Sequence, residues 1–155
     1  MRKLHFLIAS FLFVLVSVNL KAQSPCVMNY ESNETIDDAW WLNGLDWAYG
    51  SVTIQGGISS SSDVDFYRVQ ITHPGSRLRL TLRNLPKSYG MIVYYKTGYM
   101  EEPLLIDYNL NYGTSDKIID IPTCNSGGMY VKIFSPFGEY DENNCYTLTA
   151  DVLAR

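Results

Sequence analysis

The stretch Arg77-Leu-Arg-Leu-Thr-Leu-Arg83 alternates leucine with a charged or polar residue at every step. Because successive side chains of a β-strand point to opposite faces, this pattern predicts a strand with one buried side and one side in water. The preceding residues 64–72 alternate in the same way. His73-Pro74-Gly75 lies between the two segments and is typical of a turn, so we expect the two strands to form a hairpin.

Period-two patterns and turn residues recur from Tyr49 onward. The further strand candidates are residues 51–55, 91–96, 104–108, 117–121, 129–134 and 146–152. About eight short strands separated by turn signals predict an all-β fold, an antiparallel β-sandwich of jelly-roll-like type. Only residues 33–42 have helical character, and we expect one short helical turn there with Asn33 or Thr35 as its cap.

The composition is that of one globular domain. Of the 155 residues, 46% are hydrophobic and 18% are charged, which favours a packed core and excludes a disordered acidic chain. The formal net charge is −4. Affinity for nucleic acids comes mainly from basic groups that neutralise phosphates, so a nucleic-acid-binding role is disfavoured.

The N-terminal segment has the parts of a secretory signal peptide in their usual order. Arg2-Lys3 is followed by an apolar stretch and by a small residue, Ala22, at the expected cleavage position. An uncleaved anchor helix is disfavoured because the run is short of the about 20 apolar residues that a span needs. We therefore expect residues 1–22 to be removed. Residues 23–155 then form a single secreted or cell-surface domain without a membrane span.

Export changes how the three cysteines are interpreted. Cys26, Cys124 and Cys145 allow one disulfide and leave one thiol over. Outside the cytoplasm such a bond persists. The sequence has no Cys-x-x-Cys pair and no Cys/His cluster, so it offers almost nothing for a structural zinc site.

Five segments occur in the order found in one known family. They are Tyr30-Glu31-Ser32-Asn33-Glu34-Thr35, Gly50-Ser51-Val52-Thr53-Ile54, Asp63-Val64-Asp65-Phe66-Tyr67-Arg68-Val69, Gly128-Met129-Tyr130-Val131-Lys132-Ile133 and Cys145-Tyr146-Thr147-Leu148-Thr149. On these segments the chain resembles the bacterial pre-peptidase C-terminal domain, a secreted β-sandwich module often appended to exported peptidases and related to collagen-binding domains. The resemblance implies an accessory module rather than an enzyme.

The resemblance also implies a calcium site formed by Glu31, Asn33, Asp63 and Asp65. In the collagen-binding relatives of this family, the opening segment and the Asp-x-Asp strand bind calcium. Calcium prefers about six to eight oxygen ligands, which carboxylates, an amide oxygen and loop carbonyls supply. The alternative is that Asp63 and Asp65 only cap a turn.

The same resemblance implies a disulfide between Cys26 and Cys145. Family members with a cysteine just before the acidic opening often carry one before the closing Tyr-Thr-Leu. A hairpin of residues 117–121 with residues 129–134, if it forms, places Cys124 near its turn and away from Cys145. Cys124 is then left buried or free.

Aromatic residues make up 14% of the chain. Flat amphipathic rings bind sugars or protein partners at low entropic cost, so an exposed cluster indicates a recognition surface. The candidate ligand-binding residues are Trp41, Trp47, Tyr94, Tyr95 and Tyr99. In a strand, one of the adjacent Tyr94 and Tyr95 faces outward. The alternative is that most of these rings fill the core, with an exposed minority left to bind.

A catalytic arrangement is not evident. His73 is the one histidine of residues 23–155 and lies in a turn, and the usual nucleophile, zinc-protease, phosphate-loop and dinucleotide motifs are missing. We therefore expect a secreted, non-catalytic binding or accessory module that recognises an extracellular polymer, glycan or protein, with calcium as a stabilising ion. The alternative is a structural module that docks onto a partner exported protein or a cell-surface complex.

Overall fold

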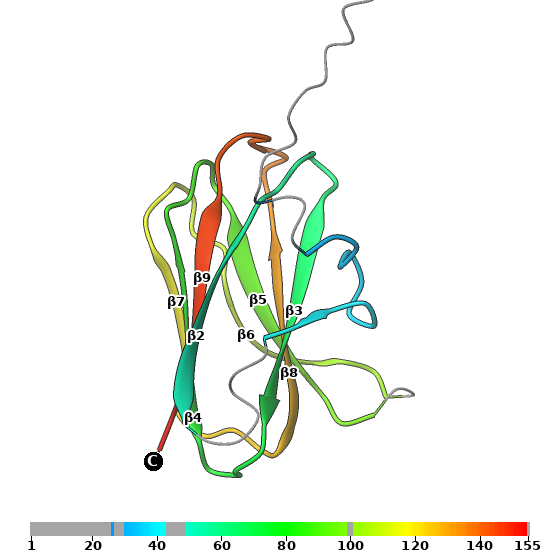
Figure 1. The fold of residues 1–155 in the computed structure, drawn as a ribbon, viewed down its shortest axis with the longest axis vertical. Coiled ribbons are helices and arrows are strands. Elements are labelled where there is room, and N and C mark those ends of the chain that lie inside the picture. Colours follow the sequence, from blue (N-terminus) through cyan, green and yellow to red (C-terminus); the bar gives the residue numbers. More distant parts are fainter. Residues whose placement is uncertain (1–25, 27–29, 43–48, 99–100, 155) are drawn as a thin grey trace, which may run out of the picture.

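The chain folds as two stacked β-sheets (Figure 1). A computed structural model describes residues 26, 30–42, 49–98 and 101–154. The expected signal peptide, residues 1–22, lies outside the described residues, and so do Trp47 and Tyr99. The strands found in the described part are β1 (Trp40–Trp41), β2 (Gly50–Gly56), β3 (Val64–Ile71), β4 (Arg77–Arg83), β5 (Gly90–Lys96), β6 (Leu104–Asn109), β7 (Lys117–Ile121), β8 (Gly127–Phe134) and β9 (Tyr146–Leu153).

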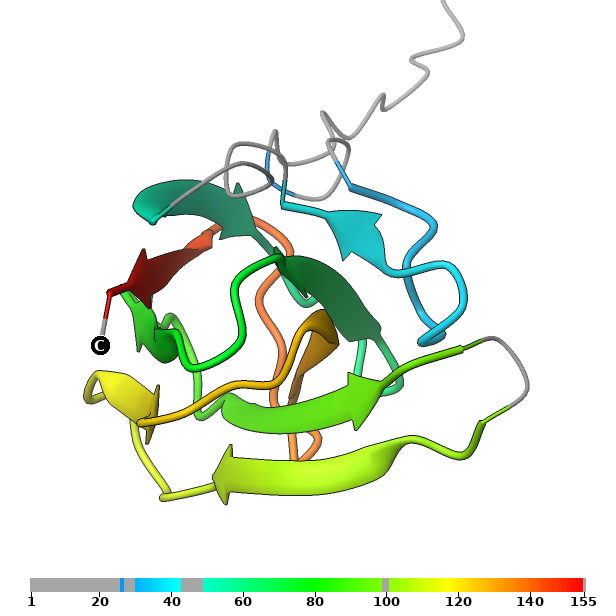
Figure 2. The ribbon, with the colours of Figure 1, turned by 90° about the horizontal axis from the view of Figure 1, so that it is seen from below.

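One sheet has the strand order β1-β3-β8-β5-β6 and the other β2-β9-β4-β7. Neighbouring strands are antiparallel except β1, which runs parallel to β3. From β2 to β9 only β5 and β6 are both consecutive and paired, and every other connection crosses between the layers seen in Figure 2. This is the pattern of a double-sheet jelly roll. The predicted sandwich is confirmed, and each of the eight expected strands lies within two residues of its observed bounds.

The expected hairpin between residues 64–72 and 77–83 is wrong. β3 and β4 lie in different sheets, and the turn at 73–75 carries the chain from one layer to the other. The conditional hairpin of residues 117–121 with 129–134 is wrong for the same reason, because β7 and β8 also lie in opposite sheets. Each of these strands buries one face. The alternating pattern therefore fits two strands stacked face to face in opposite sheets as well as two strands paired in a hairpin.

The expected helical turn in residues 33–42 is also wrong, since the described residues contain no helix. The N–H of Asp38 donates to the carbonyl of Thr35 at 3.2 Å, and the Thr35 hydroxyl donates to the Asp38 carboxylate at 2.7 Å. These bonds close a single turn. The chain then becomes extended because β1 adds to the free edge of β3. In the part of the chain that the structure describes, no helix is long and apolar enough to span a membrane.

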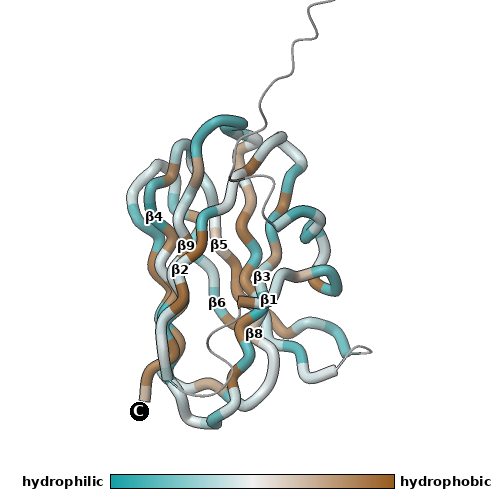
Figure 3. Tube along the Cα trace, viewed as in Figure 1, coloured by the Kyte–Doolittle hydropathy of each residue, from teal (hydrophilic) through white to brown (hydrophobic). Residues whose placement is uncertain are grey.

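The inner faces of the two sheets form the core. The predicted inward residues of β4, Leu78, Leu80 and Leu82, are fully buried, and Tyr67 and Ile71 of β3 are buried opposite them. Figure 3 shows the corresponding alternation of apolar and polar residues along the strands. Each such side chain contributes about 1.5–3 kcal/mol on burial. The core therefore fixes which residues of β3, β8 and β5 point outward.

A disulfide joins Cys26 to Cys145, the pairing that the resemblance implies, with the two Cα atoms 5.6 Å apart. It ties the start of the described chain to the residue that precedes β9. Cys124 is a buried free thiol. Its backbone N–H donates to the carbonyl of Ser76 at 2.7 Å, and its carbonyl accepts from Gly75 N–H at 2.8 Å. These bonds brace the 73–75 crossover against the segment that follows β7.

β6 forms one edge of the five-stranded sheet and exposes apolar side chains on both faces, with Leu104 at 61% exposure. Its pairing with β5 shifts at a bulge, where Ile106 has no partner across the ladder. Next to the bulge, the carboxylate of Asp107 accepts the N–H of Tyr108 at 2.8 Å. A bulge and a charged residue at an edge are two ways in which sheets limit further strand pairing.

Candidate metal centre and binding face

The opening segment lies against the start of β3 and brings the predicted acidic residues together. The N–H of Phe66 donates to the carbonyl of Asn33 at 2.8 Å, and the Asn33 amide donates to the carbonyl of Phe66 at 3.4 Å. In this arrangement one carboxylate oxygen each from Glu31, Asp63 and Asp65 lies within 4.8 Å of the others. Two segments about thirty residues apart in sequence thus meet at one cluster.

Asp65 lies at the bottom of this cluster and is only 3% exposed. The hydroxyl of Tyr146 donates to its Oδ2, and the hydroxyls of Tyr146 and Tyr67 are hydrogen-bonded at 2.7 Å. The pKa of Asp65 is raised to about 7, mainly by burial and also by the charge of Asp63, while hydrogen bonds from Tyr146 and Asn33 oppose the rise. A carboxylate at this position is therefore poorly compensated by the groups around it.

Asp63 has the turn-capping role that the alternative interpretation gives it. Its Oδ2 accepts hydrogen bonds from the backbone N–H of Ser59 at 2.5 Å and from the Ser59 hydroxyl at 2.7 Å. Asp65 does not cap a turn, because its hydrogen-bond donor is Tyr146. The capping bonds hold Asp63 in place beside Asp65, and they occupy only one of its two oxygens.

Two further features show that the cluster carries unbalanced charge and polarity. The pKa of Glu31 is raised to about 7, mainly by burial and also by the neighbouring Asp63 and Glu34. Asn33 is 1% exposed, and its Oδ1 has no hydrogen-bond partner among the described residues. A buried carbonyl oxygen without a donor is costly. A cation would relieve both the carboxylate repulsion and the unsatisfied amide oxygen.

The donor set fits calcium. The oxygens are hard ligands, and ligands on opposite sides of a calcium ion lie about 5 Å apart. The three carboxylate oxygens fall within that span. The structure therefore brings together the carboxylates of Glu31, Asp63 and Asp65, and hydrogen bonds hold Asn33 against Phe66, next to Asp65. The metal site and its calcium stay predictions.

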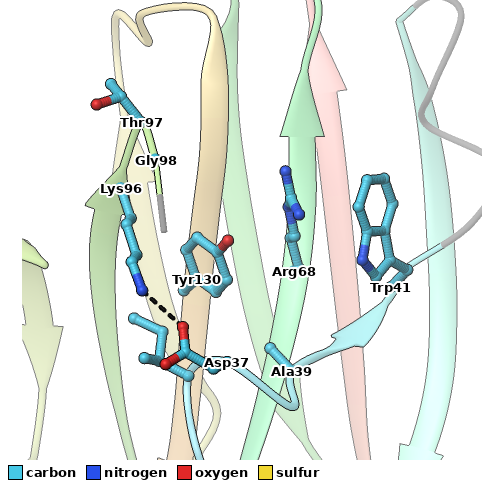
Figure 4. Close-up of a pocket in the computed structure, with 9 residues that line it drawn as sticks. Asp37, Ala39, Trp41, Arg68, Lys96, Thr97, Gly98 and Tyr130 are labelled. Carbon is cyan, nitrogen blue, oxygen red and sulfur yellow. Dashed lines mark hydrogen bonds and ion pairs between the residues drawn. The ribbon is translucent and has the colours of Figure 1, made fainter. Parts of the chain in front are cut away.

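A second feature lies on the outer face of the five-stranded sheet. The strand registers place Trp41 beside Arg68, Arg68 beside Tyr130, and Tyr130 beside Tyr94. These residues form a row across β1, β3, β8 and β5, which we call the cross-strand row. Lys96, at the end of β5, lies next to the row and is paired with Asp37 at 2.6 Å (Figure 4).

The cross-strand row contains two of the predicted ligand-binding residues. Trp41 is 43% exposed and Tyr94 is half-buried. Tyr95 points to the other side of β5, packs against the core and donates its hydroxyl to the carbonyl of Ser126 at 2.8 Å. Tyr95 is therefore not part of this face, in agreement with the core-filling alternative. Trp47 and Tyr99 lie outside the described residues.

Two adjoining hollows open along the cross-strand row. One, of about 100 Å³, is lined by residues that include Trp41, Arg68, Lys96 and Tyr130. The other, of about 350 Å³, is lined by Thr35, Ile36, Phe66, Tyr94 and Pro103. Ile36 lines both hollows. Sequence reasoning missed Arg68, Lys96 and Tyr130, although the alternation of residues 64–72 already places Arg68 on the side away from the core.

Comparisons with known proteins find a likeness among solved structures only. Neither a protein-family model nor a curated protein matches the chain. Among solved structures, the chain is similar to the pre-peptidase C-terminal domain of collagenase from Bacillus anthracis, with 15% sequence identity and a TM-score of 0.45. The match covers 66% of this chain and 88% of that one. Membership of that family stays a prediction from the sequence.

Proposed function

We propose that this chain is an exported, non-catalytic binding module that recognises an extracellular polymer through the outer face of its five-stranded sheet. The observation that carries the proposal is the cross-strand row, in which the exposed Trp41 and the half-buried Arg68 and Tyr94 lie on one face of the sheet around the buried ring of Tyr130. Aromatic rings held on a rigid sheet bind an extended ligand without losing much side-chain entropy. The two adjoining hollows make the binding surface longer than a single aromatic ring, as an extended ligand requires.

The proposal includes a calcium ion held by Glu31, Asn33, Asp63 and Asp65. Its support is the unsatisfied Oδ1 of Asn33 beside carboxylates whose pKa values are raised. The ion would fasten the opening segment to the start of β3. Because that segment leads directly into β1, calcium would also steady Trp41 in the cross-strand row.

A non-catalytic role agrees with the surroundings of the candidate catalytic groups. His73 is exposed, its Nδ1 is 2.9 Å from the hydroxyl of Thr72, and its ring contacts that of Tyr49. Asp65 is buried and accepts a hydrogen bond from the hydroxyl of the buried Tyr146. Export is proposed from residues 1–22, whose pattern is that of a signal peptide.

Sedimentation of residues 23–155 with insoluble polymers tests the proposed function. We expect retention on at least one of cellulose, chitin, xylan and collagen, and loss of retention in Trp41→Ala. The matched control is Tyr112→Ala, which removes an exposed ring from a loop away from the cross-strand row. The proposal fails if no polymer retains the protein, or if both variants bind as the unsubstituted protein does.

A second candidate function, docking onto a partner exported protein, is favoured by the exposed side chains at the other edge of the sandwich. β6 and β7 lie next to each other, and Leu104, Leu105, Tyr108 and Ile118 are all more than half exposed. Exposed apolar patches of this kind often mark protein interfaces. Ile118→Glu, on β7 of the other sheet, would abolish capture of such a partner while leaving polymer binding unchanged.

A further inference from the structure

The hollow beside Trp41 is built around a guanidinium group held between two rings. The Cζ atom of Arg68 lies 4.0 Å from the centre of the Trp41 ring and 5.5 Å from that of Tyr130 (Figure 4). A Cβ atom at Gly128 would lie 3.2 Å from Arg68 Nε, so the arginine side chain rests directly on the backbone of β8. This packing fixes the plane of the guanidinium and the direction of its N–H groups.

Arg68 differs from the other three described arginines in its charged partners. Among the four described arginines, Arg77 and Arg79 pair with Asp120, and Arg83 pairs with Asp116. Arg68 makes no ion pair with a described carboxylate. It donates one hydrogen bond, from Nη2 to Gln70 Oε1 at 2.9 Å, and its buried Nε has no acceptor among the described residues.

The lining of the hollow carries one excess positive charge. Lys96 is buried, and its Nζ lies 2.6 Å from Asp37 Oδ1, so this pair is neutral overall. Arg68 is the third charged residue of the lining, and no carboxylate among the described residues is paired with it. The sequence as a whole has a net charge of −4, so the charge of this hollow is opposite in sign to that of the whole chain. A ligand with a single negative charge would complete the balance.

We infer that this hollow binds the carboxylate of an acidic glycan, with the sugar ring on Trp41 and the carboxylate accepting hydrogen bonds from Arg68. A planar, fixed guanidinium suits a carboxylate, because its N–H groups match the two oxygens. Trp41 is 43% exposed and offers ring surface next to the guanidinium. An acidic side chain of a peptide carries the charge but has no ring for Trp41, so the uronic-acid type of sugar fits better.

This inference rests on the proposed function and names its ligand class. The test measures binding of residues 23–155 to a short oligogalacturonate by calorimetry. Two further probes are the methyl-esterified form of the same oligosaccharide, which keeps the rings and loses the charge, and a poly-glutamate peptide. Arg68→Gln removes the charge, Arg68→Lys keeps the charge without the planar fork, and Arg83→Gln is a control that removes an arginine from the opposite sheet.

We expect Arg68→Gln to weaken oligogalacturonate binding about 10- to 100-fold, because a hydrogen-bonded charge contact is lost. Arg68→Lys should weaken binding by less, and Arg83→Gln should leave it unchanged. Should Arg68→Gln fail to fold, the side-chain Nε–H signal of Arg68 in nitrogen-15 NMR spectra of the unsubstituted protein supplies the same information. We expect oligogalacturonate to shift this signal and the methyl ester to leave it in place.

The outcomes separate the two proposals. If the methyl ester binds as tightly as the acid, or Arg68→Gln binds as tightly as the unsubstituted protein, the inference is wrong and the polymer-binding function stands. If poly-glutamate binds as tightly as oligogalacturonate, the glycan assignment is wrong. If the protein binds no uronate but is retained on neutral polymers, only the inference fails, and if it binds neither, both proposals fail.

Discussion

The buried carboxyl of Asp65 makes stability depend on pH in an unusual direction. Burial raises its pKa from 3.8 to about 7. The folded state therefore binds this proton more tightly than the unfolded chain does. Without a cation, the stability that the group contributes is complete below about pH 4 and is lost as the pH rises from about 4 to 7. This difference in pKa corresponds to about 4 kcal/mol in the free energy of unfolding.

Asp65→Asn tests this reasoning because asparagine keeps the shape of the side chain and an oxygen that accepts from Tyr146. In a chelator at pH 8, we expect the variant to be more stable than the unsubstituted protein by about 2–4 kcal/mol, since it buries no charge. At pH 4 the two should differ by less than about 1 kcal/mol. Calcium at about a hundredfold over its dissociation constant should stabilise the unsubstituted protein by about 2.7 kcal/mol at pH 8 and the variant by much less.

The assay is urea unfolding followed by tryptophan fluorescence at pH 4, 6 and 8, with chelator or with calcium. The slope of the free energy of unfolding against urea concentration should be the same for the variant and the unsubstituted protein, which would show that the unfolded state is unchanged. Asp116→Asn, at a half-exposed carboxylate paired with Arg83, is the control and should change stability by less than about 1 kcal/mol. The reasoning is refuted if Asp65→Asn is less stable than the unsubstituted protein at pH 8 in chelator.

Three further predictions concern the fold and are tested by denaturant unfolding of variants. Replacing both Cys26 and Cys145 by alanine should lower the free energy of unfolding by about 2–5 kcal/mol, because the disulfide then no longer restricts the unfolded chain. An unchanged unfolding midpoint would contradict this. Gly56→Ala should cost about 1–3 kcal/mol, since a Cβ there collides with the buried tyrosine hydroxyls, whereas Gly98→Ala meets open space and should cost less than about 0.5 kcal/mol. Leu80→Ala should cost about 2–5 kcal/mol by leaving a cavity, and a smaller loss would mean that the two sheets close over it.

The alternation of residues 77–83 predicts the strand and its buried face, because side-chain direction in a strand depends only on the strand itself. It does not predict which strand lies beside it. His73-Pro74-Gly75 turns the chain equally well into a hairpin or into the opposite sheet, and only the packing of the whole sandwich decides between them. The strand β1 was not predicted for a related reason. Its two residues form a strand only by pairing with β3, which requires the folded protein.

The candidate sites differ in how far the sequence predicts them. The acidic cluster follows from the resemblance, which matches the opening segment and the Asp63–Asp65 strand, and the structure brings these residues together. Arg68 and Tyr130 cannot be grouped from the sequence, because on their own strands they are ordinary outward positions. Their relation to Trp41 depends on the registers of three strands that are far apart along the chain.

The free edge of β6 limits strand pairing between copies of this protein. An incoming strand would have to displace Asp107 from the N–H of Tyr108 and follow a ladder that falls out of step at Ile106. Fibrils grow by repeating one uninterrupted ladder, so this edge is a poor template for them. The exposed leucines of β6 therefore lie on an edge to which a further strand adds poorly.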